Sequence, residues 1–237
     1  MNNNFILKVK NLNVELDNEK VIGNLSFQVK KGEILTILGP NGAGKTVLLK
    51  ALLGILPYQG TIEWKAGIKL GYVPQRLPFI KDIPLSVREF LKLKINSEDA
   101  IKEVLKLVGI KNEILEKRID ELSSGQFQRI LVGWGLLGSP QVLLFDEPMA
   151  GIDISGQESI YDLLKNLQKE KGFTILLVSH DLSVVYKFSS NVLCLNKKVL
   201  CYGPPQEILT PENLTRLYGG EIKFYQHYHR YGNSLSS

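Results

Sequence analysis

One short glycine-rich stretch constrains this chain more than any other. It reads Gly39-Pro40-Asn41-Gly42-Ala43-Gly44-Lys45-Thr46 and matches the pattern G-x-x-x-x-G-K-[ST]. Residues 34–38 before it are typical of a buried strand, and residues 47–53 after it of a helix. Between a strand and a helix, such a loop can cradle a polyphosphate, because its N–H groups point at the phosphate oxygens. We therefore predict that the chain binds a nucleoside triphosphate. Lys45 would reach the β- and γ-phosphates, and the Thr46 hydroxyl would bind Mg²⁺.

Size and charge narrow the class of protein. The chain has 237 residues, enough for one large domain, and 44% of them are hydrophobic, enough for a real core. Its net charge of +5 is mild and its lysines are scattered, so nucleic acid is not an expected partner. We find no signal peptide at the start and no apolar run long enough to span a bilayer. We expect a cytoplasmic protein that reaches a membrane only through a partner.

The two cysteines lie in an apolar, strand-like stretch. Cys194 and Cys201 are seven residues apart and have no other ligand residues beside them. This spacing suggests neither a disulfide framework nor a zinc site. We expect two buried, reduced thiols, as is usual in the cytosol.

The pattern of apolar residues predicts an α/β fold with two additions. Residues 5–38 alternate in short runs and predict an antiparallel β subdomain. Apolar residues at three- and four-residue steps from Ser86 to about Ile119 predict a helical subdomain, inserted at about 78–123. From Val142 onward strands alternate with helices, which predicts a parallel sheet. Residues 1–221 then form one domain, and 222–237 a flexible polar tail.

Two strands of the predicted sheet are followed by residues whose side chains can bind a metal ion or take part in hydrolysis. Val142–Phe145 ends in Asp146 and Glu147, and Ile175–Ser179 ends in His180. Ligands bind at the carboxyl ends of parallel strands, beside the glycine-rich loop. We expect Asp146 to hold Mg²⁺, Glu147 to polarise an attacking water, and His180 to contact the γ-phosphate. Gln75 follows the strand at 69–73 and is a further candidate ligand for Mg²⁺ or water.

A second anion site is predicted well away from the first. Leu122-Ser123-Ser124-Gly125-Gln126 precedes a helix that we expect to begin near Phe127. Small residues at a helix N-terminus expose N–H groups to an anion. Because this element follows the helical insertion, we expect that it cannot reach the first site of its own chain. Two copies arranged head to tail would each complete the other's site.

Taken together, these motifs resemble the nucleotide-binding subunit of an ATP-binding-cassette (ABC) transporter over essentially the whole chain. The Walker A loop is Gly39–Thr46, the Q-loop residue Gln75, the signature Leu122–Gln126, Walker B Val142–Glu147, the D-loop Pro148–Asp153 and the switch histidine His180. The resemblance implies an ATP-bound homodimer in which Ser123 and Gly125 touch the γ-phosphate held by the partner. It further implies that Glu147 is the general base and that the helical insertion docks on an integral membrane permease at the cytoplasmic face.

Two positions depart from the family pattern. An aromatic residue usually stacks on adenine in the first hairpin, and Leu16 stands there, so we expect weaker stacking. The usual signature has glycine where this chain has Ser124, which is small enough for the site to survive.

A finer resemblance concerns the cargo. Stretches such as Tyr72–Arg76 and Gly203–Glu207 are similar to the zinc and manganese importers, and the match is closest to the zinc-importer ATPases. Such importers imply a metal-binding protein outside the membrane that acts through the permease. The alternatives are a manganese or iron importer, or a soluble ABC ATPase acting on ribosomes or DNA. A GTPase switch is disfavoured, because no Asn-Lys-x-Asp is present. Histidines 227 and 229 in the tail form at most a weak chelate.

Overall fold

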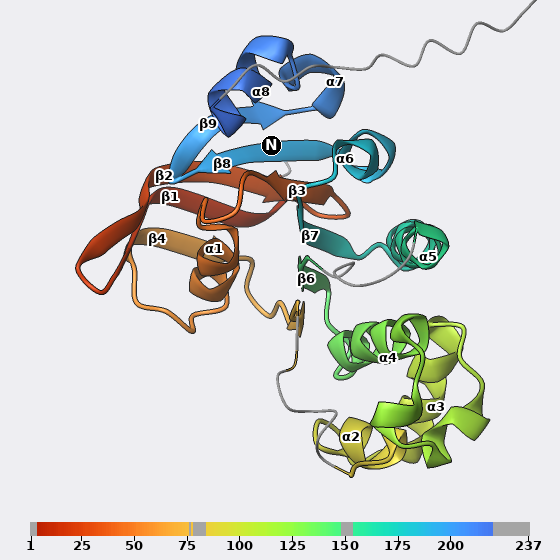
Figure 1. Cartoon of the computed structure of the whole chain (residues 1–237). Helices are drawn as coiled ribbons and strands as arrows, with labels where there is room; N and C mark the ends of the chain where they lie inside the picture. The colour runs from red at the N-terminus through yellow and green to blue at the C-terminus, as the bar shows by residue number, and fades with distance from the viewer. Residues whose placement is uncertain (1–3, 76, 78–83, 148–153, 220–237) are drawn as a thin grey trace, which may run out of the picture.

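A computed structural model describes residues 4–75, 77, 84–147 and 154–219. The expected D-loop at 148–153, the start of the insertion at 78–83 and the polar tail lie outside these residues. Two sheets and a group of helices make up the described part (Figure 1). The order of the elements confirms the predicted α/β fold with an antiparallel sheet at the N-terminus.

The strands divide into a small antiparallel sheet and a larger, mainly parallel one. The small sheet has the order β2-β1-β4, with β1 at Phe5–Leu16, β2 at Glu19–Lys30 and β4 at Gln59–Trp64. The large sheet has the order β5-β6-β7-β3-β8-β9. Its strands are β3 (Ile34–Leu38), β5 (Leu70–Val73), β6 (Val142–Asp146), β7 (Thr174–Ser179), β8 (Asn191–Asn196) and β9 (Lys198–Gly203).

Central strands of the large sheet are buried on both faces because each face has its own core. In β6, Leu143 and Phe145 pack into the core shared with the helices, whereas Val142 and Leu144 face the core beneath the small sheet. Side chains alternate along a strand with a period of two, so neighbours must serve opposite faces. Helix α1 (Lys45–Leu52) fills the space between the two sheets (Figure 1). This double burial explains why the strand lacks polar residues until it reaches its end.

The predicted helical subdomain stands at one end of the large sheet, below β6 in the view of Figure 1. It contains α2 (Val87–Lys92), α3 (Glu98–Leu107), the 3₁₀ helices η2 (Asn112–Glu116) and η3 (Ile119–Glu121), and α4 (Ser124–Leu136). Phe90 of α2 stacks on Trp134 of α4, with ring centroids 4.5 Å apart. The helices α5 (Ile154–Lys171), α6 (Leu182–Phe188), α7 (Pro205–Ile208) and α8 (Pro211–Tyr218) follow.

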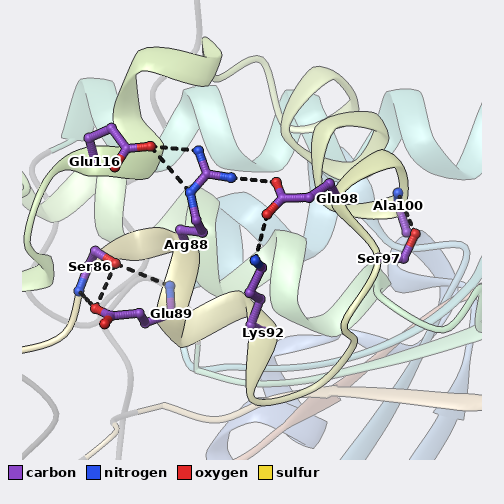
Figure 2. Close-up of polar contacts among 8 residues, drawn as sticks. All are labelled: Ser86, Arg88, Glu89, Lys92, Ser97, Glu98, Ala100 and Glu116. Atoms are coloured by element: carbon purple, nitrogen blue, oxygen red, sulfur yellow. Dashed lines mark hydrogen bonds and ion pairs between the residues drawn. The ribbon is translucent and has the colours of Figure 1, made fainter.

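Polar contacts define where the first helices of this subdomain begin (Figure 2). The Ser86 backbone N–H donates to Glu89 Oε2 at 2.8 Å, and the Glu89 N–H donates to Ser86 Oγ at 3.2 Å. This capping box satisfies two N–H groups that a helix end leaves unpaired. On the same surface Arg88 contacts both Glu98 and Glu116, which ties α2 to α3 and η2.

The prediction of reduced thiols is wrong: Cys194 and Cys201 form a disulfide. They lie directly opposite each other in the antiparallel pair β8–β9, with Cα atoms 4.9 Å apart. Alternation of strands and helices had suggested only parallel neighbours here, but a tight turn at Lys197, with φ of 58°, folds the chain back as a hairpin. Among the described residues, no helix is long and apolar enough to cross a membrane.

Candidate functional site

The glycine-rich loop connects β3 to α1, as predicted, and its shape depends on its glycines. Gly42 and Gly44 have φ values of 78° and 94°, a region that side chains other than glycine rarely adopt. A Cβ atom on Gly39 would come closer than 3.0 Å to the carbonyl oxygen of Leu195 in β8. Within the loop, Lys45 Nζ donates to the carbonyl oxygens of Gly39 at 2.8 Å and Pro40 at 3.0 Å. The lysine is therefore held at the mouth of its own loop.

Three of the predicted residues meet at Glu147. Lys45 Nζ lies 3.4 Å from Glu147 Oε1, and Gln75 Nε2 donates to Glu147 Oε2 at 3.0 Å. His180 Nδ1 lies 3.9 Å from the same Oε2. The side chain of Lys45 is 6% exposed and that of Glu147 17%, whereas that of His180 is 70% exposed and open to a ligand. The segments that follow β3, β5, β6 and β7 therefore meet at Glu147.

The backbone of Glu147 is in a conformation that costs free energy. Its φ is 45°, in the left-handed region where a non-glycine residue is uncommon. Such outliers cost on the order of 1–3 kcal/mol and persist where the surroundings hold them. Here the ion pair with Lys45 and the hydrogen bond from Gln75 hold the two carboxylate oxygens.

Asp146 forms a second, more deeply buried centre beside the first. Thr46 Oγ1 donates to Asp146 Oδ1 at 2.9 Å, and the Tyr72 hydroxyl donates to Oδ2 at 3.4 Å. Burial raises the pKa of the Asp146 carboxyl, and the charge of Glu147 raises it further, against the lowering effect of the Thr46 and Tyr72 hydrogen bonds. Burial also raises the pKa of Tyr72 to about 12, with Asp146 adding to it, so this phenol stays a donor. Sequence reasoning missed Tyr72, whose side chain points toward Asp146 from the neighbouring strand β5.

The oxygen atoms at this second centre suit a magnesium ion. Mg²⁺ prefers hard oxygen ligands and takes one or two carboxylates together with substrate phosphates. Thr46 and Asp146 supply a hydroxyl and a carboxylate 2.9 Å apart, next to the phosphate-binding loop. Gln75 contacts Glu147 through its amide nitrogen. Among the described residues, no group of three or more His, Cys, Asp or Glu side chains could hold a metal ion.

The signature stretch lies at the start of α4, and the prediction that this helix begins near Phe127 is wrong. The helix begins at Ser124, because Ser123 is its N-cap. Ser123 Oγ accepts from the Gln126 N–H at 3.2 Å, and Gln126 Oε1 accepts from the Ser123 N–H at 3.1 Å. The pattern Ser-x-x-Gln is a capping-box signal that the sequence offered. Around Gly125 a Cβ atom would meet nothing within 4 Å, so this turn can accept a neighbour.

Leu16 lies at the end of β1 and is half-buried. It pairs with Glu19 across a tight turn, in which Asp17 and Asn18 have φ values of 50° and 64°. On β2 the side chain of Val21 approaches Gly44, because a Cβ atom on that glycine would lie 3.3 Å from Val21 Cγ1. An aliphatic surface therefore flanks the glycine-rich loop on this side. Val21 was not among the residues that we predicted from the sequence to lie beside this loop.

A cavity of about 600 Å³ opens beside Glu147. It is lined by Pro40, Asn41, Glu147, His180, Leu182 and Tyr218. Four of these residues belong to motifs that the sequence predicted, and Leu182 follows the histidine by two positions. Tyr218 comes from α8 and was not predicted. Among the described residues that line this cavity, none belongs to the signature stretch at 122–126.

Comparison with protein families gives a match to the family model described as ABC transporter, over residues 22–150. Curated relatives match over most of their length. The zinc import ATP-binding protein ZnuC of Magnetococcus marinus is 39% identical, with 94% of this chain and 88% of that protein covered. The protein of the same name from Photorhabdus laumondii is 38% identical, with 94% and 89% covered.

Solved structures agree with this match. An inward-facing ABC transporter, described as of metal-chelate type, superposes with a TM-score of 0.80 at 30% identity, covering 90% of this chain and 88% of that one. The protein cbiO1 of Clostridium perfringens, part of the ABC transporter complex cbiONQ, superposes with a TM-score of 0.76 at 29% identity, covering 90% and 94%.

Proposed function

The chain belongs to the ABC transporter family, and from this we propose that it is the ATP-hydrolysing subunit of a zinc importer. The observation that carries the enzymatic part is the meeting of Lys45, Gln75 and His180 at Glu147. The zinc part is supported by relatives that are named zinc import ATP-binding proteins and match 94% of the chain.

ATP binds through the glycine-rich loop. Its N–H groups and the N-terminus of α1 face the phosphates, and Lys45 has three oxygen partners that a phosphate can replace. When the γ-phosphate arrives, Lys45 can exchange the carbonyl oxygens of Gly39 and Pro40 for phosphate oxygens. Lys45 also leaves its ion pair with Glu147 when it turns to the phosphate, and this frees the Glu147 carboxylate. Binding of the substrate would therefore release the base that the reaction needs.

Glu147 acts as the general base in this proposal. A carboxylate takes the proton of the attacking water as the water oxygen bonds to the γ-phosphorus, and the bond from that phosphorus to the bridging oxygen breaks in line, so that ADP leaves with this oxygen. Gln75 fixes one carboxylate oxygen through its amide, and His180, being largely exposed, can turn toward the γ-phosphate. Thr46 and Asp146 would hold Mg²⁺, which neutralises charge on the transferred phosphoryl group when bound.

Transport requires partners that complete the site and connect it to the membrane. As an importer subunit, the chain works with permease subunits in the membrane. We propose that two copies form a head-to-tail homodimer, in which Ser123 and Gly125 of each reach the γ-phosphate held by the other. The open surroundings of Gly125 support this arrangement. Zinc would be delivered to the permease by a metal-binding protein outside the membrane.

The test is Glu147→Gln, which removes the base and keeps the shape of the side chain. We expect ATP turnover to fall at least about 100-fold, the lower range for loss of a general base, with ATP-driven dimerisation intact. Glu170→Gln, at an exposed position of α5, is the matched control and should turn over normally. A Glu147→Gln protein with normal turnover would remove Glu147 from this role.

The cargo is tested in cells grown under metal limitation. Cells carrying Glu147→Gln should accumulate less zinc than cells carrying the intact chain or Glu170→Gln, with manganese unchanged. If manganese falls instead, the ATPase proposal survives and the cargo is manganese. If neither metal changes, the chain drives a different process.

A further inference from the structure

Tyr72 contacts the proposed magnesium site, although the sequence predicted no role for it there. It lies on β5, at the edge of the large sheet, and pairs in register with Leu144 of β6. Asp146 is two positions beyond Leu144 in the same strand. Because side chains alternate along a strand, Leu144 and Asp146 face the same side of the sheet. The Tyr72 ring packs on that side, against the core beneath the small sheet, and its hydroxyl donates to Asp146 Oδ2 at 3.4 Å.

The backbone of Tyr72 is fixed from the opposite side of β5. A Cβ atom on its neighbour Gly71 would come closer than 3.0 Å to the carbonyl oxygen of Gly135 in α4. A Cβ atom on Gly135 would in turn come closer than 3.0 Å to Val73 Cγ2. The strand therefore cannot move toward α4, and its pairing with β6 holds it sideways. The hydroxyl of Tyr72 thus has a defined place relative to Asp146.

Asp146 needs such a contact because its carboxylate can rotate. The torsion that turns a carboxylate on its side chain has broad minima, so one donor does not fix both oxygen atoms. Here each oxygen has its own donor, since Thr46 Oγ1 donates to Oδ1 at 2.9 Å and Tyr72 donates to Oδ2. Asp146 is 3% exposed, which leaves little room for bulk water as a substitute donor. The two donors together keep Oδ1 turned toward Thr46 and the glycine-rich loop.

We propose that Tyr72 is a positioning residue for Mg²⁺: by holding Asp146 Oδ2, it keeps Oδ1 turned to the place where the metal would bind beside Thr46. This rests on the proposed binding of Mg²⁺-ATP at the same loop. A contact of 3.4 Å is long for two oxygen atoms. Polar contacts of a site are often long in the free protein and shorten when the ligand binds. Loss of a neighbour that orients a metal ligand typically lowers metal affinity by about 10–100-fold.

The experiment measures ATP affinity with and without the metal in Tyr72→Phe, which keeps the ring and removes the hydroxyl. The proteins with and without this change both carry Glu147→Gln, so that ATP is not consumed. Titration calorimetry gives the dissociation constant for ATP in excess Mg²⁺ and in EDTA. In Mg²⁺ we expect Tyr72→Phe to raise this constant about tenfold, the lower end of the range for such neighbours. In EDTA we expect equal constants, because Tyr72 acts on the metal and not on the phosphates.

Tyr202→Phe is the matched control, because it removes a tyrosine hydroxyl that donates to the Gln28 carbonyl oxygen instead. It should leave the constants in Mg²⁺ and in EDTA unchanged. If Tyr72→Phe raises both constants alike, or raises neither, the inference is overturned and the proposed function stands. If the protein with Tyr72 binds ATP equally in Mg²⁺ and in EDTA, the magnesium site itself is wrong. If it binds no ATP at all, the proposed function fails as well.

Turnover at varied Mg²⁺ gives a second test, with Glu147 intact. Tyr72→Phe should need about tenfold more free Mg²⁺ for half-maximal turnover, with kcat at saturating Mg²⁺ unchanged. A lower kcat with an unchanged requirement for Mg²⁺ would show a general structural effect of the hydroxyl and would overturn the inference.

Discussion

Gly39 is the position at which the glycine-rich loop depends most sharply on a neighbouring strand. A Cβ atom there would come closer than 3.0 Å to the Leu195 carbonyl oxygen and lie 3.2 Å from Ala43 Cβ. Because Leu195 is fully buried in β8, which pairs with both β3 and β9, its carbonyl cannot move without moving a strand. We therefore expect Gly39→Ala to be destabilising in a way that no side-chain rotation can relieve.

The magnitude follows from two opposing effects. Alanine reduces the conformational freedom of the unfolded chain and would stabilise by about 0.4–1 kcal/mol in an unstrained position. Overpacking a well-packed core costs about 1–3 kcal/mol and occasionally more, and a backbone clash lies at the upper end. We expect a net loss of about 2–3 kcal/mol, which lowers the melting temperature of a domain of this size by about 4–12 °C.

Gly42→Ala is the matched control, because it lies in the same loop with nothing within 4 Å of the added Cβ. Its φ of 78° alone should cost about 1 kcal/mol. Urea denaturation of both variants gives the comparison. ATP affinity should also fall in Gly39→Ala, because the Gly39 carbonyl anchors Lys45. The reasoning is refuted if Gly39→Ala costs no more than Gly42→Ala.

Two further predictions concern positions outside this loop. Reduction of the bond between Cys194 and Cys201 should lower stability by about 2.5 kcal/mol, the chain-entropy value for so short a loop. Urea denaturation with and without dithiothreitol measures this, and a Cys201→Ser protein that still responds to the reductant would contradict it. Leu16→Tyr should tighten ATP binding by about 3–10-fold through stacking on adenine. Titration calorimetry with ATP and with tripolyphosphate, which has no base, checks this, and an equal gain for both would exclude stacking.

The predicted site residues lie together because their positions depend on local sequence. Glu147 and His180 each follow a continuous apolar run, and such runs form adjacent parallel strands. Once the strands are parallel, their carboxyl ends meet at one edge of the sheet. The same argument brings Gln75 to Glu147, since β5 pairs with β6. Sequence reasoning was therefore sufficient to find these side chains without any knowledge of their distances.

The disulfide could not be predicted in this way, because it depends on register rather than on spacing. Cys194 and Cys201 are seven residues apart, and only a hairpin turn at Lys197 places them opposite each other. Had the chain continued into a crossover helix, as the preceding alternation of strands and helices suggested, the two thiols would lie far apart. The turn conformation, a single residue with positive φ, decides between these outcomes.

The position of Tyr218 in the cavity wall could not be predicted either, because it depends on packing between segments that are far apart in the sequence. The stretch Leu217-Tyr218-Gly219 is similar to the metal importers, but nothing within α8 indicates that Tyr218 lines the cavity, since the helix is explained by the burial of Leu214 and Leu217. The residue reaches the cavity only because Leu217 packs near Leu38 and bonds to Asn196, contacts between segments far apart in sequence. A motif search ends at His180, the last element of the family pattern. The wall of the cavity beside Glu147 therefore extends into the C-terminal helix α8, through packing contacts that sequence spacing does not reveal.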